Sequence, residues 1–353
     1  MSHIKKIIII RRDNIGDLLC TTPAIRALRE KFPDAQIDIL VNSYNKAIIE
    51  NNPDINNVLV YRKTKHEPYR NKLSIWLEVL RLYLKIWMGK YDVAIGASSH
   101  YIPRVGRFTF FTGARRRIGY ISQKGLLPRL FYNCPVKSPE RSVHEVKVIF
   151  DLLHPLGIKS HPGNLILNIS DVEKNGIETF LKTNGIKRDE PLIGIHISSR
   201  KKQNRWSPDK FIQLIDFLMT AWKVAVLLLW MPGDEDNPYH PGDDKKAFYI
   251  AEKTIRRPLC YRTTSLKELI ASISVCRMLI CGDGGAMHIA AAFGIPVVTI
   301  WGITDERRWA PWITEHIILK GKENADDISV EEVIEAVRKF SKSPTKPIFP
   351  CSM

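Results

Sequence analysis

The sequence has no G-x-G-x-x-G turn after its first apolar segment, no paired cysteines and no long hydrophobic run. That glycine turn is the main signature of NAD-binding domains, so its absence disfavours a nicotinamide-dependent oxidoreductase. The six cysteines show neither a C-x-x-C pair nor metal-ligand spacing, which disfavours a zinc site. No segment approaches the roughly 20 apolar residues that a membrane span requires. Ser-His-Asp and Cys-His nucleophile patterns and nucleic-acid-binding motifs are also missing.

The N-terminal segment does not resemble a secretory signal. Its apolar run is four isoleucines long and is followed by Arg11, Arg12 and Asp13. Several cysteines lie in apolar contexts, where a reduced thiol behaves as a small hydrophobic group. We therefore expect a cytoplasmic chain that is soluble or, at most, peripheral to a membrane.

Positive charge is abundant and unevenly distributed. The 353 residues are 44% hydrophobic and carry a net charge of +16, and this length is typical of two domains. Residues 61–147 contain 18 Lys and Arg against five Asp and Glu, a net charge of +13, so the rest of the chain is close to neutral. A field concentrated in this way attracts nucleic acid, an acidic lipid surface or a phosphorylated glycolipid.

Short β-branched segments alternate with helical patterns in both halves of the chain. This rhythm predicts parallel sheets with right-handed crossovers, and hence two doubly wound α/β domains. We place them at residues 1–166 and 167–353. The last helix is expected at about 329–340, with packing back on the first domain as one possible arrangement, and residues 341–353 are expected to form a loose tail. The expected strands are 7–11, 36–41, 58–61, 93–96, 192–196, 224–230, 278–281 and 297–300, and the main helices are 18–31, 72–88, 171–184, 208–220, 266–273 and 286–293.

The helix predicted over residues 72–88 carries an apolar stripe with cations at its margins. Two tryptophans beside cations could anchor at a lipid interface. Such a stripe more often packs on its own sheet, and this helix leads directly into a strand, so we favour packing. The stripe comprises Leu73, Trp76, Leu77, Leu80, Leu84 and Trp87, and the cations are Lys72, Arg81, Lys85 and Lys90.

The most informative segment runs from Cys281 to Trp301. It reads as a strand, a glycine turn and a small-residue helix followed by a second strand. Unpaired backbone N–H groups and the helix dipole at such a turn suit a phosphate group, and Gly284 and Gly285 let a ligand approach. The alternative is an ordinary crossover with glycines for tight packing. Asp283 precedes the turn and His288 follows it.

Two further segments place polar groups after strands. Gly16 and Asp17 follow the first strand, so Asp17 (or Asp13) is either a helix N-cap or a carboxylate that serves as a general base. Ser198 and Ser199 follow the strand 192–196 with a basic loop, which suits a diphosphate but is also consistent with a solvated loop. The basic residues of that loop are Arg200, Lys201, Lys202 and Arg205.

The segment Asp234-Glu235-Asp236 matches the D-x-D pattern that holds a divalent metal in some nucleotide-sugar enzymes. It follows an apolar strand of a Rossmann-like unit, where an acidic residue more often accepts hydrogen bonds from ribose hydroxyls. We therefore favour a nucleotide contact here and expect no metal.

Together these segments resemble glycosyltransferase family 9, the bacterial heptosyltransferases that extend the lipopolysaccharide core. The resemblance covers most of the chain and is carried by three places. The first is Gly16-Asp17 followed by Thr22 to Arg29, and the second is Arg205-Trp-Ser-Pro-Asp-Lys-Phe211. The third, and most specific, runs from Asp283-x-Gly-x-x-His288 through Gly302-Ile-Thr-Asp305 to Arg308-Trp-Ala-Pro-Trp312.

The resemblance implies a GT-B architecture, with two Rossmann-like domains facing across a cleft. It implies an inverting, metal-independent transfer of heptose from ADP-heptose to a Kdo- or heptose-bearing lipopolysaccharide core acceptor. The expected partners are the nucleotide-sugar donor, the anionic glycolipid acceptor and the inner face of the bacterial inner membrane. No cofactor is expected beyond the ADP-sugar co-substrate, and no nucleic acid.

The resemblance also assigns roles to residues. Asp17 would be catalytic. The acceptor would be bound by Gly16, Arg62, Lys63, Arg115, Arg116 and Arg117. The donor would be bound by Ser198, Ser199, Lys202, Arg205, Glu235, Thr264, Asp283, Gly284, Gly285, Ala286, Met287 and His288.

The sequence departs from the family pattern at two of these places. Gly284 stands where the family usually has Thr or Ser, and Asn204 stands where it often has a Lys. We expect Arg205 or Lys202 to supply that charge instead. Two alternatives stay open: a GT-B transferase with another nucleotide sugar or a protein acceptor, and a non-enzymatic basic protein that binds nucleotides or nucleic acid. The second gives Asp17 no role.

Overall fold

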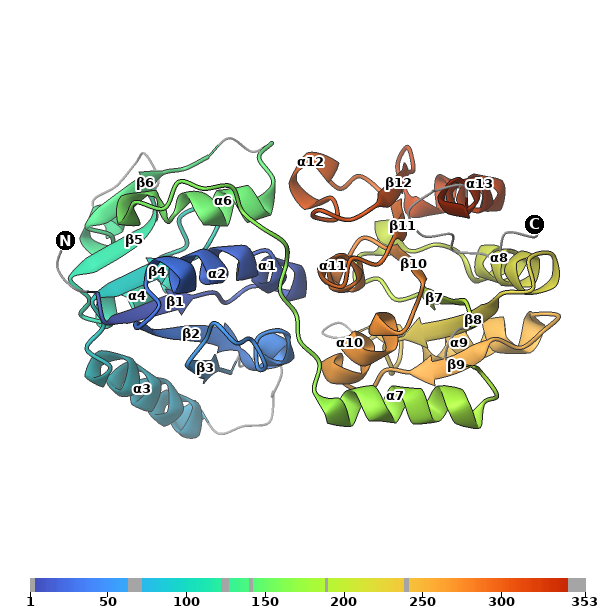
Figure 1. Cartoon of the computed structure of the whole chain (residues 1–353), viewed down its shortest axis with the longest axis horizontal. Coiled ribbons are helices and arrows are strands. Elements are labelled where there is room, and N and C mark those ends of the chain that lie inside the picture. The colour runs from blue at the N-terminus through green and yellow to red at the C-terminus, as the bar shows by residue number, and fades with distance from the viewer. Residues whose placement is uncertain are drawn as a thin grey trace. The chain divides into compact units, whose positions relative to one another are not determined.

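The chain folds into two compact units, Met1–Asn168 and Ile169–Met353, which we call unit 1 and unit 2 (Figure 1). The division lies two residues beyond the predicted one. The computed structural model describes residues 4–62, 72–121, 127–139, 142–187, 190–237 and 241–341. Most of the predicted tail lies outside these ranges.

Unit 1 is built on a six-stranded parallel sheet of order β3-β2-β1-β4-β5-β6. This is the Rossmann order: successive strands are added on one side of β1 up to β3, and from β4 onward on its other side. Ile7 of β1 pairs with Ile37 of β2 on one side and with Val93 of β4 on the other. The strands are β1 Lys6–Ile10, β2 Gln36–Asn42, β3 Asn57–Tyr61, β4 Val93–Gly96, β5 Arg116–Ile121 and β6 Cys134–Lys137.

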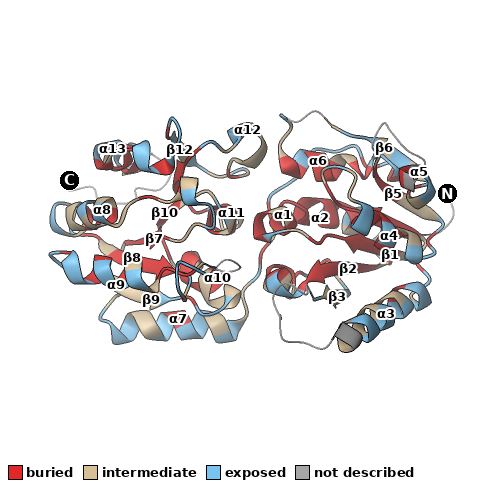
Figure 2. Ribbon diagram, turned by 180° about the vertical axis from the view of Figure 1, so that it is seen from behind, coloured by how far each residue is buried: buried red, intermediate tan, exposed pale blue. Residues whose placement is uncertain are grey.

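Helices cover both faces of this sheet. α3 (Lys72–Met88) packs with α4 (Pro103–Phe111) on one face, and α2 (Thr22–Lys31) packs with α6 (Glu145–Asp151) on the other (Figures 1 and 2). The helix expected over 18–31 is broken, because the Thr22 hydroxyl donates to the carbonyl of Leu19 at 2.7 Å and Pro23 has no N–H to offer it. The remaining helical segments are α1 Ile15–Leu19, η1 Ser43–Ile48, α5 Leu127–Phe131 and η3 His154–Leu156.

Unit 2 repeats the architecture, with strand order β12-β11-β10-β7-β8-β9 and all strands parallel. Its strands are β7 Leu192–His196, β8 Ala225–Trp230, β9 Leu259–Arg262, β10 Met278–Gly282, β11 Val297–Trp301 and β12 His316–Lys320. Its helical segments are α7 Asp171–Thr183, η4 Lys202–Asn204, α8 Pro208–Thr220, α9 Asp244–Lys253, α10 Leu266–Ser274, α11 Gly285–Ala292, α12 Glu306–Trp309, η5 Ala325–Asp327 and α13 Val330–Ser341.

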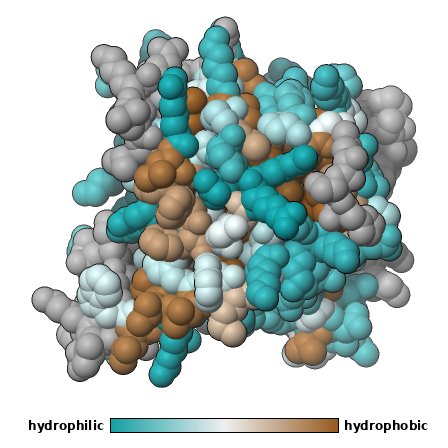
Figure 3. All heavy atoms as spheres, turned by 90° about the vertical axis from the view of Figure 1, so that its left-hand side faces the viewer, coloured by the Kyte–Doolittle hydropathy of each residue, from teal (hydrophilic) through white to brown (hydrophobic). Residues whose placement is uncertain are grey.

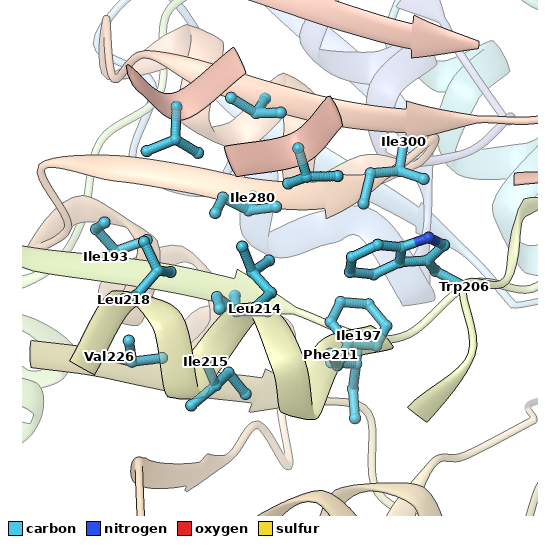
Figure 4. Close-up of a cluster of buried hydrophobic side chains, with 14 of the residues drawn as sticks. Ile193, Ile197, Trp206, Phe211, Leu214, Ile215, Leu218, Val226, Ile280 and Ile300 are labelled. Atoms are coloured by element: carbon cyan, nitrogen blue, oxygen red, sulfur yellow. The ribbon is translucent and has the colours of Figure 1, made fainter. Parts of the chain in front are cut away.

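The core of unit 2 gives the Arg-Trp-Ser-Pro segment a structural role. Trp206 is 3% exposed and packs edge-on against Phe211 at the start of α8 (Figure 4). Its indole N–H donates to the carbonyl of Ile328 at 2.9 Å. Val333, Ala336, Val337 and Phe340 of α13 belong to the same cluster, so the last helix packs on the sheet of its own unit.

The apolar stripe of α3 differs from our expectation. Ile86 is buried and Leu82 and Tyr83 pack with it, so one face of the helix does join the core of unit 1. The predicted stripe lies on another face: Trp76 is 74% exposed and Trp87 is 64% exposed. The packing interpretation is therefore wrong for the described stripe residues. The side chain of Leu73 lies outside the described residues. The others, all exposed, are Leu77, Leu80 and Leu84.

Two doubly wound α/β units confirm the predicted fold class. The cysteines that the structure describes are all free. Among the helices of the described ranges, none combines the length and the apolar character needed to cross a bilayer.

Candidate functional site

In unit 1 the polar candidates gather where β1 and β4 end. In an open parallel sheet, ligands bind outside the carboxyl ends of the strands, where the strand order reverses. β1 is followed by Arg11 to Asn14 and then by α1, which carries Asp17 in its first turn. β4, its neighbour in the sheet, is followed by Ala97. The topology therefore places Asp17 at the edge where a ligand is expected.

Both oxygens of the Asp17 carboxylate are held by donors. Oδ1 accepts from the Arg11 guanidinium at 3.0 Å, and Oδ2 accepts from the backbone N–H and side-chain amide of Asn14 at 2.9 and 3.1 Å. Asn14 is the N-cap of α1, and Asp17 completes the cap from the third helical position. A carboxylate offers about four acceptor positions. Three are used, so one on Oδ1 remains, and the side chain is 14% exposed. Capping and catalysis are thus compatible roles.

Arg11 is fully buried and links three parts of unit 1. Its guanidinium donates to the carbonyl of Ala97 at 2.7 Å, to Asp17, and to the buried carboxylate of Glu145 at 2.7 Å. Burial alone would lower the pKa of Arg11, but the charges of Asp17, Glu145 and Asp13 outweigh it and raise the pKa above its usual value. Arg11 therefore stays charged and fixes the orientation of Asp17.

Arg12, next along the chain, was not singled out from the sequence. It is 6% exposed, and its guanidinium lies 4.2 Å from the centre of the Tyr61 ring. Burial lowers its pKa. Its Nε has no hydrogen-bond partner within the described ranges. Two adjacent arginines directly after an apolar strand were the available signal, because one of them must lie on each face of the strand end.

The predicted acceptor residues that the structure describes lie at opposite edges of the unit 1 sheet. Arg62 follows the carboxyl end of β3, on the same edge as Asp17, and lies 3.8 Å from Glu78. Arg115, Arg116 and Arg117 are at the amino end of β5, the opposite edge of the sheet. The guanidinium of Arg117 donates to the carbonyls of Phe131 and Ala114, both at 3.0 Å. The structure does not bring this triplet together with Asp17, and Lys63 lies outside the described residues.

In unit 2 the predicted donor residues lie at one edge of the sheet. Ser198 and Ser199 follow β7, and Asp283 follows β10, which pairs directly with β7. Glu235 follows β8, the neighbour on the other side. The carboxyl ends of these strands form the reversal point of this sheet. The positions of these four residues agree with a nucleotide site in unit 2. In unit 1, the position of Asp17 agrees with a site for a second ligand.

Arg205 connects two of these segments. Its Nε donates to the carbonyl of Ser199 at 3.0 Å, and its Nη1 forms an ion pair with Glu235. Among the acidic residues 234–236, Glu235 is thus the one beside the serine loop, since Asp234 pairs with Lys245 at 3.6 Å. Lys202 is exposed. Of the two candidate cations, Arg205 is the one that is 13% exposed and fixed in place.

Asn204, where the family often has Lys, is a structural link. It is 3% exposed; its amide donates to Asp283 Oδ2 at 2.9 Å, and its oxygen accepts from the backbone N–H of Gly302 at 3.2 Å. The hydroxyl of Thr304 donates to the same Asp283 oxygen at 2.7 Å. Asp283 therefore connects the loops that follow β7, β10 and β11 through hydrogen bonds. We assign it this structural role in place of a direct contact with phosphate.

The glycine turn before α11 leaves its backbone accessible. Gly284 is the N-cap, and a Cβ added there would meet nothing within 4 Å. Its φ of 168° is extended backbone that any residue adopts. Ala286 and Met287 are buried, and His288 is 3% exposed and lies edge-on to Trp309 at 6.2 Å between ring centres. Only backbone N–H groups of Gly285 and its neighbours can therefore contribute at the start of this helix.

Thr264, another predicted donor residue, has a local structural partner. The hydroxyl and the backbone N–H of Thr264, after β9, both donate to Glu268, at 2.6 and 2.7 Å. Within the described part of the chain, no three His, Cys, Asp or Glu residues are grouped closely enough to share a metal ion.

Lys246 of α9 is a second residue that the sequence did not reveal. Its ammonium group donates to the carbonyl of Trp206 at 2.7 Å and lies 4.9 Å from the centre of the Phe211 ring. Burial lowers the pKa of Lys246 to about 8, although Asp243 opposes the shift. Burial, followed by the charge of Lys246, lowers the pKa of His196 to about 4. The carboxyl end of β7 therefore has two groups of lowered pKa beside it, the imidazole of His196 and the amine of Lys246.

Comparison with known proteins identifies the family. The model of glycosyltransferase family 9 (heptosyltransferase) matches residues 79–336. Lipopolysaccharide heptosyltransferase 3 of Escherichia coli K12 is 27% identical over 92% of this chain and 95% of its own length. A family 9 glycosyltransferase from Veillonella parvula superposes with a TM-score of 0.83 at 20% identity, covering 96% of this chain and 98% of that one.

The E. coli heptosyltransferase WaaC, solved with ADP-2-deoxy-2-fluoro heptose, superposes with a TM-score of 0.74 at 16% identity over 95% of this chain and 99% of that one. These similarities place the two-unit fold among GT-B glycosyltransferases. The resemblance inferred from the motifs at Asp17, Arg205 and Asp283 is confirmed, because the family model spans well over half of the chain. The chain belongs to glycosyltransferase family 9, the heptosyltransferase family, and is a glycosyltransferase.

Proposed function

We propose that this enzyme transfers heptose from ADP-heptose to the core of a lipopolysaccharide acceptor, with inversion at the anomeric carbon and without a metal ion. The observation that carries the proposal is the Asp17 carboxylate in a chain of this family, held by Arg11 and Asn14 with one acceptor position open. Relatives named as lipopolysaccharide heptosyltransferases support the substrate class.

In the proposed reaction Asp17 acts as general base. The acceptor hydroxyl donates to the open position on Oδ1. Its oxygen attacks the anomeric carbon, the new C–O bond forms, and the bond to the diphosphate oxygen breaks. The proton passes to Asp17, and ADP leaves with the electron pair. Arg11 is a positioning residue in this scheme, since it holds the carboxylate and does not touch either substrate.

Arg12 and Arg62 are the cations we assign to the acceptor. Both follow strands at the edge that carries Asp17, and the Arg12 guanidinium is buried against an aromatic ring, where its Nε donates no hydrogen bond within the described ranges. A phosphate or carboxylate of the inner core would be held by these guanidinium groups through charge-assisted hydrogen bonds. This assignment replaces Arg115–Arg117, which lie at the opposite edge of the sheet.

The donor diphosphate is assigned to the turn at Gly284 and Gly285 and to Arg205. Backbone N–H groups and the dipole of α11 stabilise the leaving group, and the guanidinium adds a full charge. Glu235, which pairs with Arg205 in this structure, then accepts from the ribose hydroxyls. These groups supply the charge that a metal ion provides elsewhere. The enzyme is assigned to the cytoplasm, at the inner face of the inner membrane where such acceptors are exposed.

A panel of nucleotides tests the donor class. ADP at about 100 times its Kd should stabilise the protein by about 2.7 kcal/mol and raise its melting temperature, whereas NAD, UDP and GDP should not. Product analysis with ADP-heptose and a defined core acceptor then tests the transfer itself. Stabilisation by UDP or GDP alone would reject the ADP-sugar assignment, and stoichiometric ADP release without a heptosylated product would reject the acceptor class.

A further inference from the structure

The outward side of α3 is an apolar surface with no covering element in the described part of the chain. Six of its side chains are between 46% and 74% exposed. We call this set the α3 outer face; it comprises Trp76, Leu77, Leu80, Leu84, Trp87 and Met88. Soluble proteins rarely expose so many large apolar side chains side by side without a binding role.

The outer face is a continuous stripe. At 100° per residue the six side chains fall within an arc of about 120°. Leu82 and Ile86, which pack on unit 1, fall on the other side of the helix, and Tyr83, which also packs there, lies at the margin of the arc. The helix is therefore fixed by one face and presents the other to its surroundings. Figure 3, which looks at this end of unit 1, shows hydrophobic side chains gathered in a strip beside hydrophilic ones.

Exposed cations flank the stripe. Arg81 and Lys85 are exposed at one margin, about 20–60° from the apolar arc. Arg104 and Arg107 are exposed on α4, which packs against α3. The single acidic residue in the α3 sequence, Glu78, lies 3.8 Å from Arg62. Tryptophan and leucine on one face with Lys and Arg beside it is the composition of a helix that lies in a lipid interface.

We infer that the α3 outer face docks unit 1 onto an anionic lipid bilayer, with Trp76 and Trp87 at the headgroup boundary and Arg81 and Lys85 against lipid phosphates. The inference builds on the proposed lipid-linked acceptor and names the element that brings the enzyme to it. α3 lies flat on the surface in this arrangement, since no helix of the described ranges can span a bilayer.

Charge argues against a second copy of the chain as the occupant. A two-fold dimer would place the outer face against itself, and the same cations would then meet across the interface. Within the described part of α3 there is no free carboxylate to compensate Arg81 and Lys85. An anionic membrane compensates them and accepts the apolar stripe at the same time.

Vesicle flotation of the full-length enzyme tests this docking. Vesicles of phosphatidylcholine with one third phosphatidylglycerol should carry the wild type, and vesicles of phosphatidylcholine alone should carry much less. Trp76→Ser with Trp87→Ser, and separately Arg81→Gln with Lys85→Gln, should each lower the partition coefficient on the order of tenfold or more. The loss in the Gln variant should shrink as salt rises.

Matched variants in unit 2, on α7 and on the segment that follows α9, control for exposure and charge. Val172→Ser with Ile255→Ser removes two side chains that are 78% and 77% exposed, and Lys174→Gln with Lys182→Gln removes two exposed cations. Neither pair should change the partition coefficient. Unchanged melting temperature and ADP-induced stabilisation show that every variant is folded.

Three results would overturn the inference: no flotation of the wild type, equal loss in the unit 2 controls, or a wild-type dimer that the Trp variant dissociates while flotation is absent. Transfer to a delipidated, water-soluble acceptor separates this inference from the proposed function. The Trp variant should transfer heptose to that acceptor at the wild-type rate. Absence of transfer by the wild type with intact flotation would reject the proposed function and leave the docking inference standing.

Discussion

Asp17 combines two roles, because it caps α1 and carries the open acceptor position. Asp17→Asn keeps the shape and can keep the hydrogen bond from Arg11, but it loses the hydrogen bonds from Asn14 and removes the basicity. We predict that kcat falls by about 10²–10⁴ while the ADP-induced melting shift is unchanged, because the donor residues belong to unit 2. Asp13→Asn is the matched control: Asp13 lies 3.6 Å from Arg11 and carries the same charge. Equal losses in both variants would mean that only local charge matters.

Arg11 is predicted to act through orientation, and a paired substitution separates this role from stability. Arg11→Met leaves Glu145 buried without its guanidinium and should cost about 3–5 kcal/mol of unfolding free energy. Arg11→Met with Glu145→Leu should recover most of that loss, since an apolar pair of similar volume replaces the ion pair. Both variants should show low kcat with unchanged KM for ADP-heptose. Full activity in the double variant would show that Arg11 is only structural.

Lys246 gives the folded state a distinct dependence on pH. Its pKa is lowered to about 8 by burial, whereas the unfolded chain keeps the usual value near 10.5. Between these values the unfolded state binds more protons, so this group makes stability rise with pH. The advantage of the wild type over Lys246→Met in unfolding free energy should therefore grow from pH 8 to pH 10.5. Lys245→Met, with an 83% exposed side chain, should show no such trend, and a constant difference for Lys246→Met would contradict the assignment.

At the level of strands and helices, the sequence was most informative about buried strands. β1, β4, β7, β8, β10 and β11 are runs of apolar residues, and these runs placed each strand near its observed position. β5, β6, β9 and β12 were not predicted. β6, β9 and β12 are edge strands, and edge strands such as Cys134–Lys137 are only partly buried and lack a clear pattern. Thr22 shows a further limit: one hydroxyl bonded to the carbonyl of Leu19 divides a helical pattern into two helices.

The site residues could be predicted from the sequence only where they directly follow a predicted strand. Polar groups directly after predicted strands, such as Asp17 and Asp283, were found because carboxyl ends of parallel strands share one edge. Arg115–Arg117 were grouped with them by charge alone. Their strand was not predicted, so the sequence held no information on which edge they would occupy. Asn204 and Glu145 act through contacts 79 and 134 residues away along the chain, which no local pattern encodes.

The glycines in the loops after β10 and β11 differ in the space that is available for a side chain. A Cβ at Gly284 meets open space, whereas one at Gly302 would lie 2.6 Å from the carbonyl oxygen of Gln203 and 2.9 Å from Asn204 Oδ1. Gly284→Ala should therefore change the unfolding free energy by less than about 0.5 kcal/mol. Gly302→Ala should cost about 1–3 kcal/mol, since it displaces η4. Chemical denaturation measures both, and equal costs would contradict this account.

Gly284→Ser extends this comparison to function. It restores the hydroxyl that the family usually places here, in a position with free space around it. If the backbone N–H groups of α11 hold the diphosphate, KM for ADP-heptose should be unchanged or lower. A higher KM would mean that the added side chain obstructs the ligand.

At the scale of the whole molecule, charge and chemistry are distributed unequally between the units. Residues 61–147, with a net charge of +13, belong to unit 1, together with Asp17 and α3. The proposed donor residues all belong to unit 2, which has its own sheet and hydrophobic core. In the proposed scheme, unit 1 binds the anionic glycolipid and the membrane, and unit 2 binds the nucleotide.

This division predicts that unit 2 binds nucleotide alone. A protein of residues 169–353 should unfold cooperatively, because Trp206, α8 and α13 complete its core without residues from unit 1. ADP should raise its melting temperature as it does for the full chain, and Arg205→Gln should reduce that shift in both. Heptose transfer should be absent, since Asp17 is missing. A cooperatively folded unit 2 that ADP fails to stabilise would show that nucleotide binding needs groups from unit 1, and the assignment of the diphosphate to Gly284, Gly285 and Arg205 would then be incomplete.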